Sequence, residues 1–346
     1  MQNIWKKIVI FANENRTKRM MEDLKVSILV PVYGVEKFIR QCAESLFSQS
    51  YTNLEFVFVD DCTPDNSIAV LQEALRDYPA RKNQVRIVRH QTNRGVGAAR
   101  KIALATATGD FVLSVDGDDY LLPDAVDTLI KIQGETEADI VTGSYFSLFP
   151  DGTIKEMCYQ TLDKPKTLKL QLAQNTIPPC IWGRLIRRSV YTDNRIDTVE
   201  GINMAEDYGL TPRLIFAARR IAYTNKAIYI YRQNSPTSTF SQLSRKHVIS
   251  ILKANEVVRQ YIQAHDHRQE YAFALETGML NAWHTALKGG LTRSEISDIC
   301  HYMPRGVLFR LCHLLFAHRS TLPLLRFSYL TIKWCYKRRL HYSDKH

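Results

Sequence analysis

The first 120 residues alternate between continuous apolar runs and stretches in which apolar residues recur every three or four positions. A short continuous run predicts a buried strand, and the wider spacing predicts an amphipathic helix. The predicted strands are 26–33, 53–59, 85–88 and 111–115, and the predicted helices are 36–48, 67–78 and a stretch that follows the turn at 93–100 and ends at 108. This β-α-β-α-β-α-β order predicts a parallel sheet with right-handed crossovers.

The pattern after residue 120 is less regular. Helices are expected at 123–132, 162–175 and 208–218, with Pro212 in the first turn of the last, and one or two amphipathic helices at 245–287. Strands are expected at 138–144 and 145–149, and 221–231 alternates like an edge strand. Loops are expected at 178–184, 201–207 and 235–241.

Composition restricts the class of protein. Of the 346 residues, 45% are hydrophobic and 23% are charged, as in ordinary folded soluble proteins. The seven scattered cysteines show no C-x-x-C spacing, which indicates neither a disulfide framework nor a zinc site and favours a reducing compartment. Residues 302–346 hold nine Lys or Arg and one acid, so they supply +8 of the net charge of +11. The rest of the chain has nearly equal numbers of basic and acidic residues, which argues against a nucleic-acid enzyme.

Three carboxylates follow the strand at 111–115 directly: Asp116, Asp118 and Asp119. They lie in a turn at the carboxyl end of a parallel strand, where open α/β sheets bind ligands. Acids so close together repel unless a cation or protons offset them, and a hard divalent ion that also holds a diphosphate would fit. The alternative is a solvated turn in which Asp119 or Asp124 caps the next helix.

Two other strand ends must reach the same edge of the sheet. They carry Tyr33, in the segment 31–33, and Asp61, which follows Asp60. A nucleotide needs an aromatic wall for its base, an acceptor for a base N–H and a metal for its phosphates, and Tyr33, Asp61 and Asp118 could supply these in turn. The alternative for Asp61 is a turn that caps the following helix.

The stretch Gly95-x-Gly97-x-x-Arg100 resembles the dinucleotide-binding fingerprint. We reject that reading because the motif lies in the third β-α turn, and because Arg100 replaces a small residue needed for close helix–strand packing. Arg100 suits a phosphate contact better. Its alternative is a solvent-facing charge on the helix.

Four motifs in order are similar to those of family 2 glycosyltransferases with the GT-A fold, enzymes that build bacterial capsule, exopolysaccharide and lipopolysaccharide. They are VSILVPVYGVEKFIRQCAESLFSQSY, EFVFVDDCTPDNS, HQTNRGVGAARKIALATATGDFVLSVDGDD and the downstream Glu206-Asp207. The resemblance implies an α/β GT-A three-layer sandwich with a mostly parallel central sheet and a C-terminal helical extension. It divides the chain into an extension at 1–24, a transferase domain at 25–240 with a nucleotide-binding half at 25–120 and an acceptor half at 121–240, and a basic helical region at 241–346.

The resemblance also implies roles for individual residues. The nucleoside is bordered by Pro31, Val32, Tyr33 and Glu36, the uracil is bonded by Asp61, and the ribose and diphosphate lie by Asn93 and Arg100. The D-x-D motif consists of Asp116, Gly117 and Asp118, with Asp118 as the direct ligand of Mn or Mg, and the segment that closes over the diphosphate contains Tyr231, Arg232 and Ser238 or Ser235. The catalytic base is Asp207, after Glu206, and Trp182 lies on the acceptor side.

The sequence departs from the family pattern at four places. Gly34 replaces a usual Asn, Cys62 a common Gly, and Lys101 a common Asn. The run Trp182-Gly183-Arg184 replaces Trp-Asn-Lys, so no acceptor identity is carried over.

The function implied is transfer of a sugar from a nucleotide sugar, with UDP as the expected nucleotide, to a hydroxyl of a glycan or polyprenyl-linked acceptor, with inversion. Asp207 would act as general base; the alternative for Glu206-Asp207 is a charge pair at a helix N-terminus. Residues 303–346 interleave Arg and Lys with aromatics and leucines, which favours peripheral contact of a cytoplasmic protein with the inner leaflet of the membrane over a solvated helical cap. The rival functions are a nucleotidyltransferase and a non-catalytic nucleotide-sugar-binding protein.

Overall fold

The computed structural model describes residues 24–159, 161–174, 177–233 and 244–302. Within them the chain forms two compact units. Unit 1 comprises residues up to 161, 180–203 and 214–241, and unit 2 comprises 162–179, 204–213 and residues from 242 on. The expectations for 1–23, Ser235, Ser238 and 303–346 fall outside the described residues.

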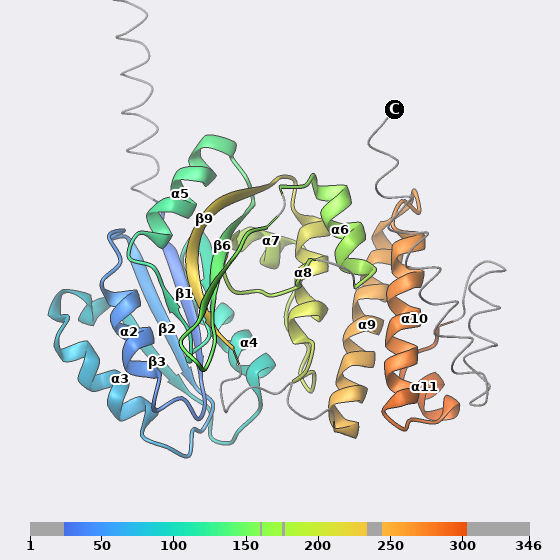
Figure 1. Ribbon diagram of the computed structural model, residues 1–346, viewed down its shortest axis with the longest axis horizontal. Helices are drawn as coiled ribbons and strands as arrows, with labels where there is room; N and C mark the ends of the chain where they lie inside the picture. Colours follow the sequence, from blue (N-terminus) through green and yellow to red (C-terminus); the bar gives the residue numbers. More distant parts are fainter. Residues whose placement is uncertain (1–23, 160, 175–176, 234–243, 303–346) are drawn as a thin grey trace, which may run out of the picture. The chain divides into compact units, whose positions relative to one another are not determined.

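Unit 1 contains a single mixed sheet (Figure 1). Its strands in the described chain are β1 (Val26–Val32), β2 (Leu54–Asp60), β3 (Val85–Arg89), β4 (Phe111–Ser114), β5 (Tyr120–Leu121), β6 (Ile140–Leu148), β7 (Ile154–Met157), β8 (Arg184–Arg187) and β9 (Ile221–Arg232). The order is β3-β2-β1-β4-β8-β6-β9-β5, with β7 paired to β6. The four strands predicted from apolar runs are neighbours and parallel, as expected.

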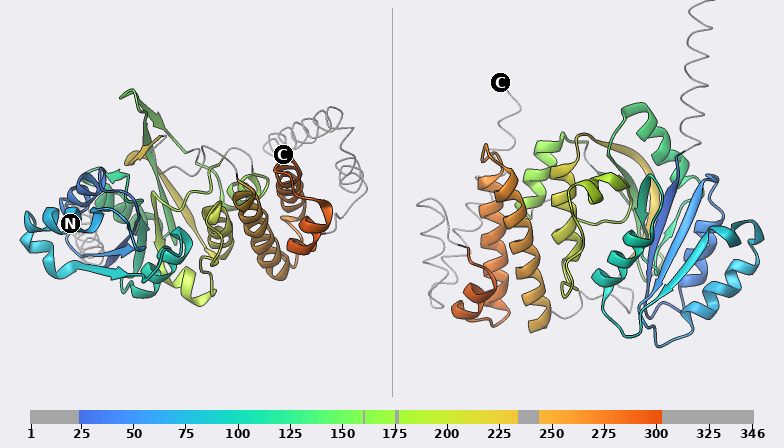
Figure 2. Two further views of the ribbon diagram at one scale, coloured as in Figure 1. Left: turned by 90° about the horizontal axis from the view of Figure 1, so that it is seen from below. Right: turned by 180° about the vertical axis from the view of Figure 1, so that it is seen from behind.

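Helices cover both faces of this sheet. Those of unit 1 are α2 (Ile39–Phe47), α3 (Ser67–Arg76), the 3-10 helix η1 (Pro79–Gln84), α4 (Val96–Thr106), α5 (Ala125–Thr136) and α7 (Arg188–Asp193). The chain moves outward from β1 to β3 and then returns to β4, so right-handed crossovers place α2 and α3 on one face and α4 on the other (Figure 2). Nearly all of β1 and β2 is buried, which explains their continuous apolar sequence.

Three expectations for the chain beyond residue 120 were wrong. The two strands expected at 138–149 form one strand, β6. The strand β9 is not an edge, because the short β5 pairs with it on the side away from β6. Pro212 lies inside α8 (Glu206–Ala217) rather than in its first turn, because that helix begins two residues earlier than its apolar pattern indicates.

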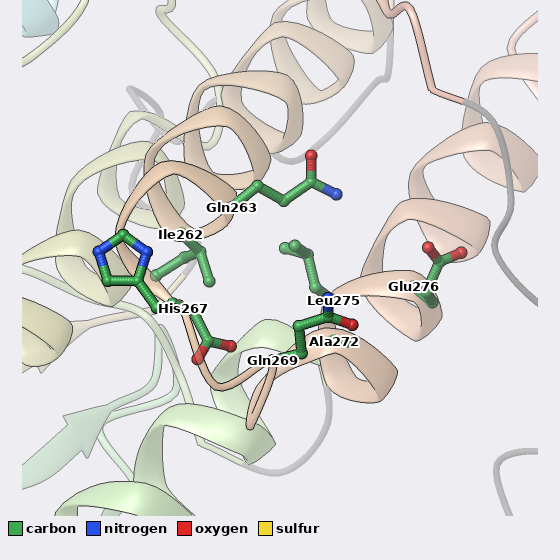
Figure 3. A pocket seen from close by; sticks show the side chains of 8 residues that line it. Ile262, Gln263, His267, Gln269, Ala272, Leu275 and Glu276 are labelled. Atoms are coloured by element: carbon green, nitrogen blue, oxygen red, sulfur yellow. The ribbon is translucent and has the colours of Figure 1, made fainter.

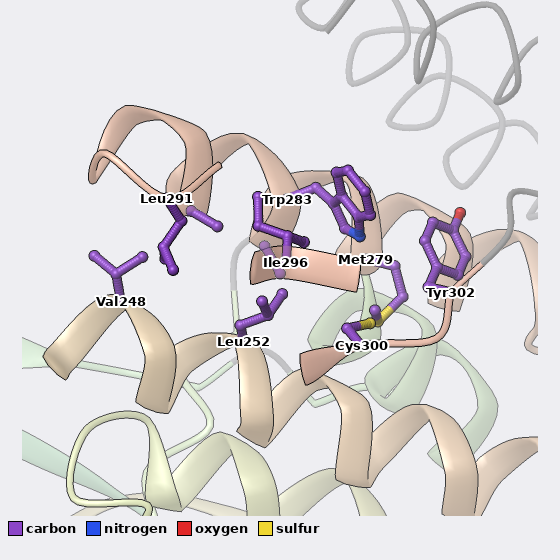
Figure 4. Packing of buried hydrophobic residues seen from close by; sticks show 10 residues of the cluster. Val248, Leu252, Met279, Trp283, Leu291, Ile296, Cys300 and Tyr302 are labelled. Carbon is purple, nitrogen blue, oxygen red and sulfur yellow. The ribbon is translucent and has the colours of Figure 1, made fainter. Parts of the chain in front are cut away.

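Unit 2 is helical. It contains α6 (Lys164–Leu172), the first part of α8, α9 (Arg245–His265), α10 (Ala272–Lys288) and α11 (Arg293–Ile299). A buried apolar cluster joins α9, α10 and α11 through side chains such as Leu252, Trp283 and Ile296 (Figure 4). No helix among the described residues is long and apolar enough to cross a membrane.

Glu55 stabilises the edge of the sheet at which the parallel strands begin. It is 3% exposed and accepts hydrogen bonds from Ser27 Oγ at 2.5 Å, from Thr108 Oγ1 at 2.8 Å and from the Gly109 amide at 3.2 Å, and it pairs with Lys25 at 2.9 Å. Burial alone would raise the pKa of Glu55, but these donors outweigh it and hold the pKa at about 2. The ionised carboxylate therefore joins the starts of β1, β2 and β4.

We expect the lowered pKa of Glu55 to make folding stability depend on pH. A carboxyl group with a pKa of about 2, against an ordinary 4.5, stabilises the fold above pH 4.5 and loses that contribution as the pH falls toward 2. The loss amounts to about 3 kcal/mol in the free energy of unfolding. Urea unfolding of the wild type and Glu55→Gln across this range tests it: the two curves should converge at low pH, and a constant difference would contradict the assignment.

Candidate active site

The carboxyl ends of β1, β2 and β4 meet at one edge of unit 1. The amide of Asp61, after β2, donates to the carbonyl of Val32 at the end of β1 at 3.1 Å. Gly117, after β4, lies so close to the carbonyl of Pro31 that a Cβ at this glycine would approach it to 3.0 Å. The three segments predicted to converge are therefore in contact.

The turn at 116–119, which we call the acidic turn, places its three carboxylates in different surroundings. Asp116 pairs with Arg100 at 2.8 Å, and Arg100 is 6% exposed. The alternative interpretation of Arg100 as a solvent-facing charge is therefore wrong. Asp119 is 1% exposed and accepts from the Tyr229 hydroxyl at 2.8 Å and the Arg232 amide at 2.7 Å. It is therefore not a solvated cap. Asp118 remains half-buried.

The electrostatics of the turn follow from this division. Burial, followed by the charges of Asp118 and Asp116, raises the pKa of Asp119 well above its ordinary value. Nearby, the hydroxyl of Tyr229 accepts from the Asp116 amide at 3.1 Å, so one tyrosine connects both ends of the turn. Sequence reasoning missed Tyr229, which is 110 residues from Asp119.

Arg232, at the end of β9, packs against the outside of the turn. Its Nε donates to the carbonyl of Asp118 at 2.6 Å, and its guanidinium lies over the rings of Phe38 and Tyr120, 5.2 and 5.0 Å from their centroids. These contacts hold β9 to the acidic turn. That Tyr231 and Arg232 close over a diphosphate stays a prediction.

Trp182 lies inside a stack of aromatic rings. Its ring is parallel to those of Tyr229 and Tyr231, with centroids 4.6 and 5.0 Å away, and it is 7% exposed. Arg184, two residues on, is 1% exposed and donates to the Cys180 carbonyl and the Thr142 hydroxyl, both at 2.7 Å. Arg184, which departs from the family pattern, thus stabilises the loop through the hydrogen bonds of its buried side chain. The acceptor-side role of Trp182 stays a prediction.

Asp61 is buried behind the end of β2, with 2% exposure. Its carboxylate lies 2.7 Å from Nδ1 of His90 and accepts from the amides of Arg94 at 2.9 Å and Gly95 at 2.7 Å. Asp61 does not cap α3, since Asp65 accepts from the Ser67 amide at the start of that helix. His90, a second residue that sequence reasoning missed, could have been found as the first polar residue after β3 at the same edge.

The other residues expected around a nucleoside differ in exposure. Tyr33 is 46% exposed and presents its ring at the edge, whereas Val32 is fully buried and offers only its backbone. Glu36 accepts from the Asn66 amide at 3.1 Å, and Asn93 Oδ1 accepts from the Gly95 amide at 3.0 Å. Both side chains therefore also stabilise the loops that carry them.

Glu206 and Asp207 belong to unit 2, in the first turn of α8, and are half-buried. The start of this helix is held inside unit 2, because the Met204 amide donates to Ser250 Oγ at 3.0 Å and the Tyr208 hydroxyl donates to the Leu172 carbonyl at 3.2 Å. Ala205 just before it has φ +61°, a left-handed conformation that costs an alanine energy. Such strain is frequent at functional sites.

Backbone conformation explains two of the departures from the family pattern. Gly34 and Gly183, which replace asparagine, have φ at +68° and +67°. Glycine and asparagine are the residues that adopt this conformation most readily, so glycine replaces asparagine at these two positions without loss of the backbone shape. Cys62, which replaces glycine, has φ +57°, a conformation that costs a cysteine energy.

A separate pocket of about 200 Å³ opens in unit 2 between the end of α9 and the start of α10 (Figure 3). Gln263, His267 and Glu276 are among the residues that line it. It contains none of the residues predicted from sequence. In the described part of the chain, no group of three or more His, Cys, Asp or Glu side chains is arranged to hold a metal.

A mostly parallel sheet with an acidic turn and a buried aspartate at its carboxyl edge defines the GT-A class of transferase folds. The crystal structure of Staphylococcus aureus TarS 1-349 in complex with UDP-GlcNAc shares this fold, with a TM-score of 0.58 and 21% identity over 91% of this chain and 92% of that one. The fold class predicted from the sequence is therefore confirmed.

Sequence comparison places the chain within that class. The model of glycosyl transferase family 2 matches residues 27–194. The relative named "Putative glycosyltransferase EpsH", from Bacillus subtilis (strain 168), is 31% identical over 77% of this chain and 79% of its own length. The uncharacterized glycosyltransferase YibD of Escherichia coli (strain K12) is 28% identical over 65% of this chain and 66% of its own. The chain belongs to glycosyltransferase family 2, and the comparisons give no support to the two rival functions.

We expect Tyr229→Phe to destabilise the acidic turn. The change removes the acceptor of the Asp116 amide and one of the donors to the buried Asp119 carboxylate, which costs about 1–3 kcal/mol in the free energy of unfolding. Urea unfolding measures this cost. Tyr33→Phe is the control, because Tyr33 is exposed and its change should stay within about 0.5 kcal/mol. Equal effects of the two substitutions would contradict the role of Tyr229.

Proposed function

We propose that this glycosyltransferase moves a sugar from a UDP-sugar to a hydroxyl of a glycan or polyprenyl-linked acceptor, with inversion, during synthesis of a bacterial surface polysaccharide. One observation supports it most: Asp61, the Arg100–Asp116 pair and Asp118 lie at the joined carboxyl ends of parallel strands in unit 1. This gives one edge an acceptor for a base, a cation for phosphate and carboxylates for a metal. TarS, a relative at 26% identity, is named as a poly(ribitol-phosphate) beta-N-acetylglucosaminyltransferase.

The donor would bind with its nucleoside near Tyr33 and Asp61. The exposed ring of Tyr33 offers a stacking surface, and the side-chain oxygens of Asp61 can accept the imide N–H of uracil. Arg100 is buried on α4 and directed at the acidic turn, where its guanidinium can also neutralise a diphosphate.

The donor set of the acidic turn fits a hard divalent cation. Asp116 and Asp118 are half-buried carboxylates of the kind that Mn²⁺ or Mg²⁺ prefers, and the remaining ligands would come from the donor's phosphates and water. In this proposal Asp118 holds the ion and Asp116 supports it. The ion would supply positive charge that stabilises the departing UDP.

Asp207 would accept the proton of the acceptor hydroxyl as general base, with Glu206 beside it. Their place in the strained, anchored start of α8 supports this assignment. No protein nucleophile is needed, since direct displacement inverts the anomeric carbon.

The excess of Lys and Arg among the aromatic residues of 303–346 supports peripheral binding to the anionic inner leaflet, where a polyprenyl-linked acceptor would be found.

We expect Asp207→Asn to abolish transfer while leaving donor binding intact. Loss of the general base should lower kcat by about 10²–10⁴-fold, whereas the dissociation constant of UDP should not change, because the donor contacts are made by other residues. Calorimetry with UDP and an assay of UDP release measure the two quantities. Substantial turnover by the variant would refute the assignment of Asp207.

We expect the purified protein to hydrolyse one UDP-sugar slowly when manganese is present. A screen of UDP-sugars with and without a chelator measures free UDP, and Asp118→Asn is the matched variant. The chelator and the variant should both suppress hydrolysis, because each removes the cation from the leaving group. Hydrolysis unaffected by both would exclude a metal at this turn.

A further inference from the structure

His90 is a buried histidine to which the proposed function gives no role. It follows β3 directly, and its amide donates to the carbonyl of Asp60 at 2.9 Å, which continues the pairing of β3 with β2 by one residue. Its side chain is 6% exposed, and its Nδ1 lies 2.7 Å from Oδ1 of Asp61. Backbone pairing therefore places the histidine beside the residue proposed to bind the base.

The two adjacent acids at the end of β2 have different partners. Asp60 pairs with Nε of Arg89 at 3.0 Å and accepts from the Thr63 amide at 2.8 Å, and Arg89 is also its partner in the β2–β3 register. Asp61 has His90 in the corresponding place. All of these residues belong to unit 1, so the arrangement does not depend on unit 2.

The donors around Asp61 are divided unevenly between its two oxygens. Oδ1 accepts from the Arg94 amide at 2.9 Å and also faces His90, whereas Oδ2 accepts from the Gly95 amide at 2.7 Å. Gly95 has φ +85°, a conformation that glycine adopts without steric cost. A carboxylate presents about two acceptor directions on each oxygen. With His90 as a donor, both directions of Oδ1 are filled and one direction of Oδ2 is left.

We propose that His90 is a positioning residue for the nucleotide base: its Nδ1–H binds Oδ1 of Asp61, which leaves Oδ2 as the acceptor for the N3–H of uracil. This inference rests on the proposed function and names the side chain that gives the site its preference for a uracil nucleotide. Cytosine carries an acceptor at N3, so a carboxylate held in this orientation sets two acceptors against each other. Such a repulsive contact rejects the wrong ligand.

Two variants of similar shape test the proposal. Leucine and asparagine are nearly isosteric, and asparagine can place an amide N–H near the position of Nδ1, so His90→Asn keeps the donor that His90→Leu removes. Arg89→Gln is the matched control, because it removes the basic partner of Asp60 and leaves the contacts of Asp61 unchanged. Calorimetry with manganese present measures the dissociation constants of UDP and CDP, and urea unfolding shows whether each variant is folded.

In His90→Leu we expect the dissociation constant of UDP to rise about tenfold, because one hydrogen bond that orients the carboxylate is lost. The dissociation constant of CDP should change by less than about twofold, so the preference for UDP falls. His90→Asn and Arg89→Gln should keep the preference of the wild type. A merely structural role would weaken both nucleotides alike. An unchanged preference in His90→Leu, or an equal fall in His90→Asn, would overturn the proposal.

The hydrogen on His90 provides a second measurement. Nitrogen-15 NMR of the full chain labelled at histidine should show a hydrogen on Nδ1 of His90, with the signal assigned by its absence from whichever of the two variants folds. A bare Nδ1 would contradict the proposal. If the wild type binds neither UDP nor CDP, the proposed function fails, and His90 has no role in base binding. If the wild type prefers UDP and His90→Leu keeps that preference, the proposed function stands and this inference fails.

Discussion

Three carboxylates within four positions are the constraint on which the site of this glycosyltransferase depends. Left together in a partly buried turn they would repel one another. The fold separates their roles: Arg100 neutralises Asp116, Tyr229 and the Arg232 amide bind Asp119, and Asp118 keeps partial exposure. The helix α4 and the strand β9 are both tied to the turn through these contacts, so the acidic turn organises packing as well as chemistry.

Much of unit 1 could be predicted because its signals are local. Continuous apolar runs identify β1 to β4, and the rule that parallel strands end at one edge brings Asp61 and Asp118 together without knowledge of any contact. The partners of these acids could not be predicted. His90 and Tyr229 are ordinary residues in sequence, and only the closure of the sheet places them at Asp61 and Asp119. The position of β9 was missed for a similar reason, since β5 has only two residues and no pattern of its own.

Backbone conformation explains two residues in which this chain departs from its family. Positive φ at Gly34 and Gly183, where the family has asparagine, shows that these positions require a residue that adopts this conformation readily. The glycines of α4 illustrate a different demand, because close approach of residues 199–203 leaves no room for a Cβ. Spacing alone cannot distinguish glycines that admit a ligand from glycines that admit another part of the chain.

Binding of UDP is the most direct measurement of the central claim, that acids on separate loops of one sheet edge form a single nucleotide–metal site. Isothermal titration of the full chain with UDP should show binding at one site that requires manganese and is strongly weakened both in Asp118→Asn and in Asp61→Ala. Manganese-independent binding, or affinity that neither substitution changes, would contradict the account.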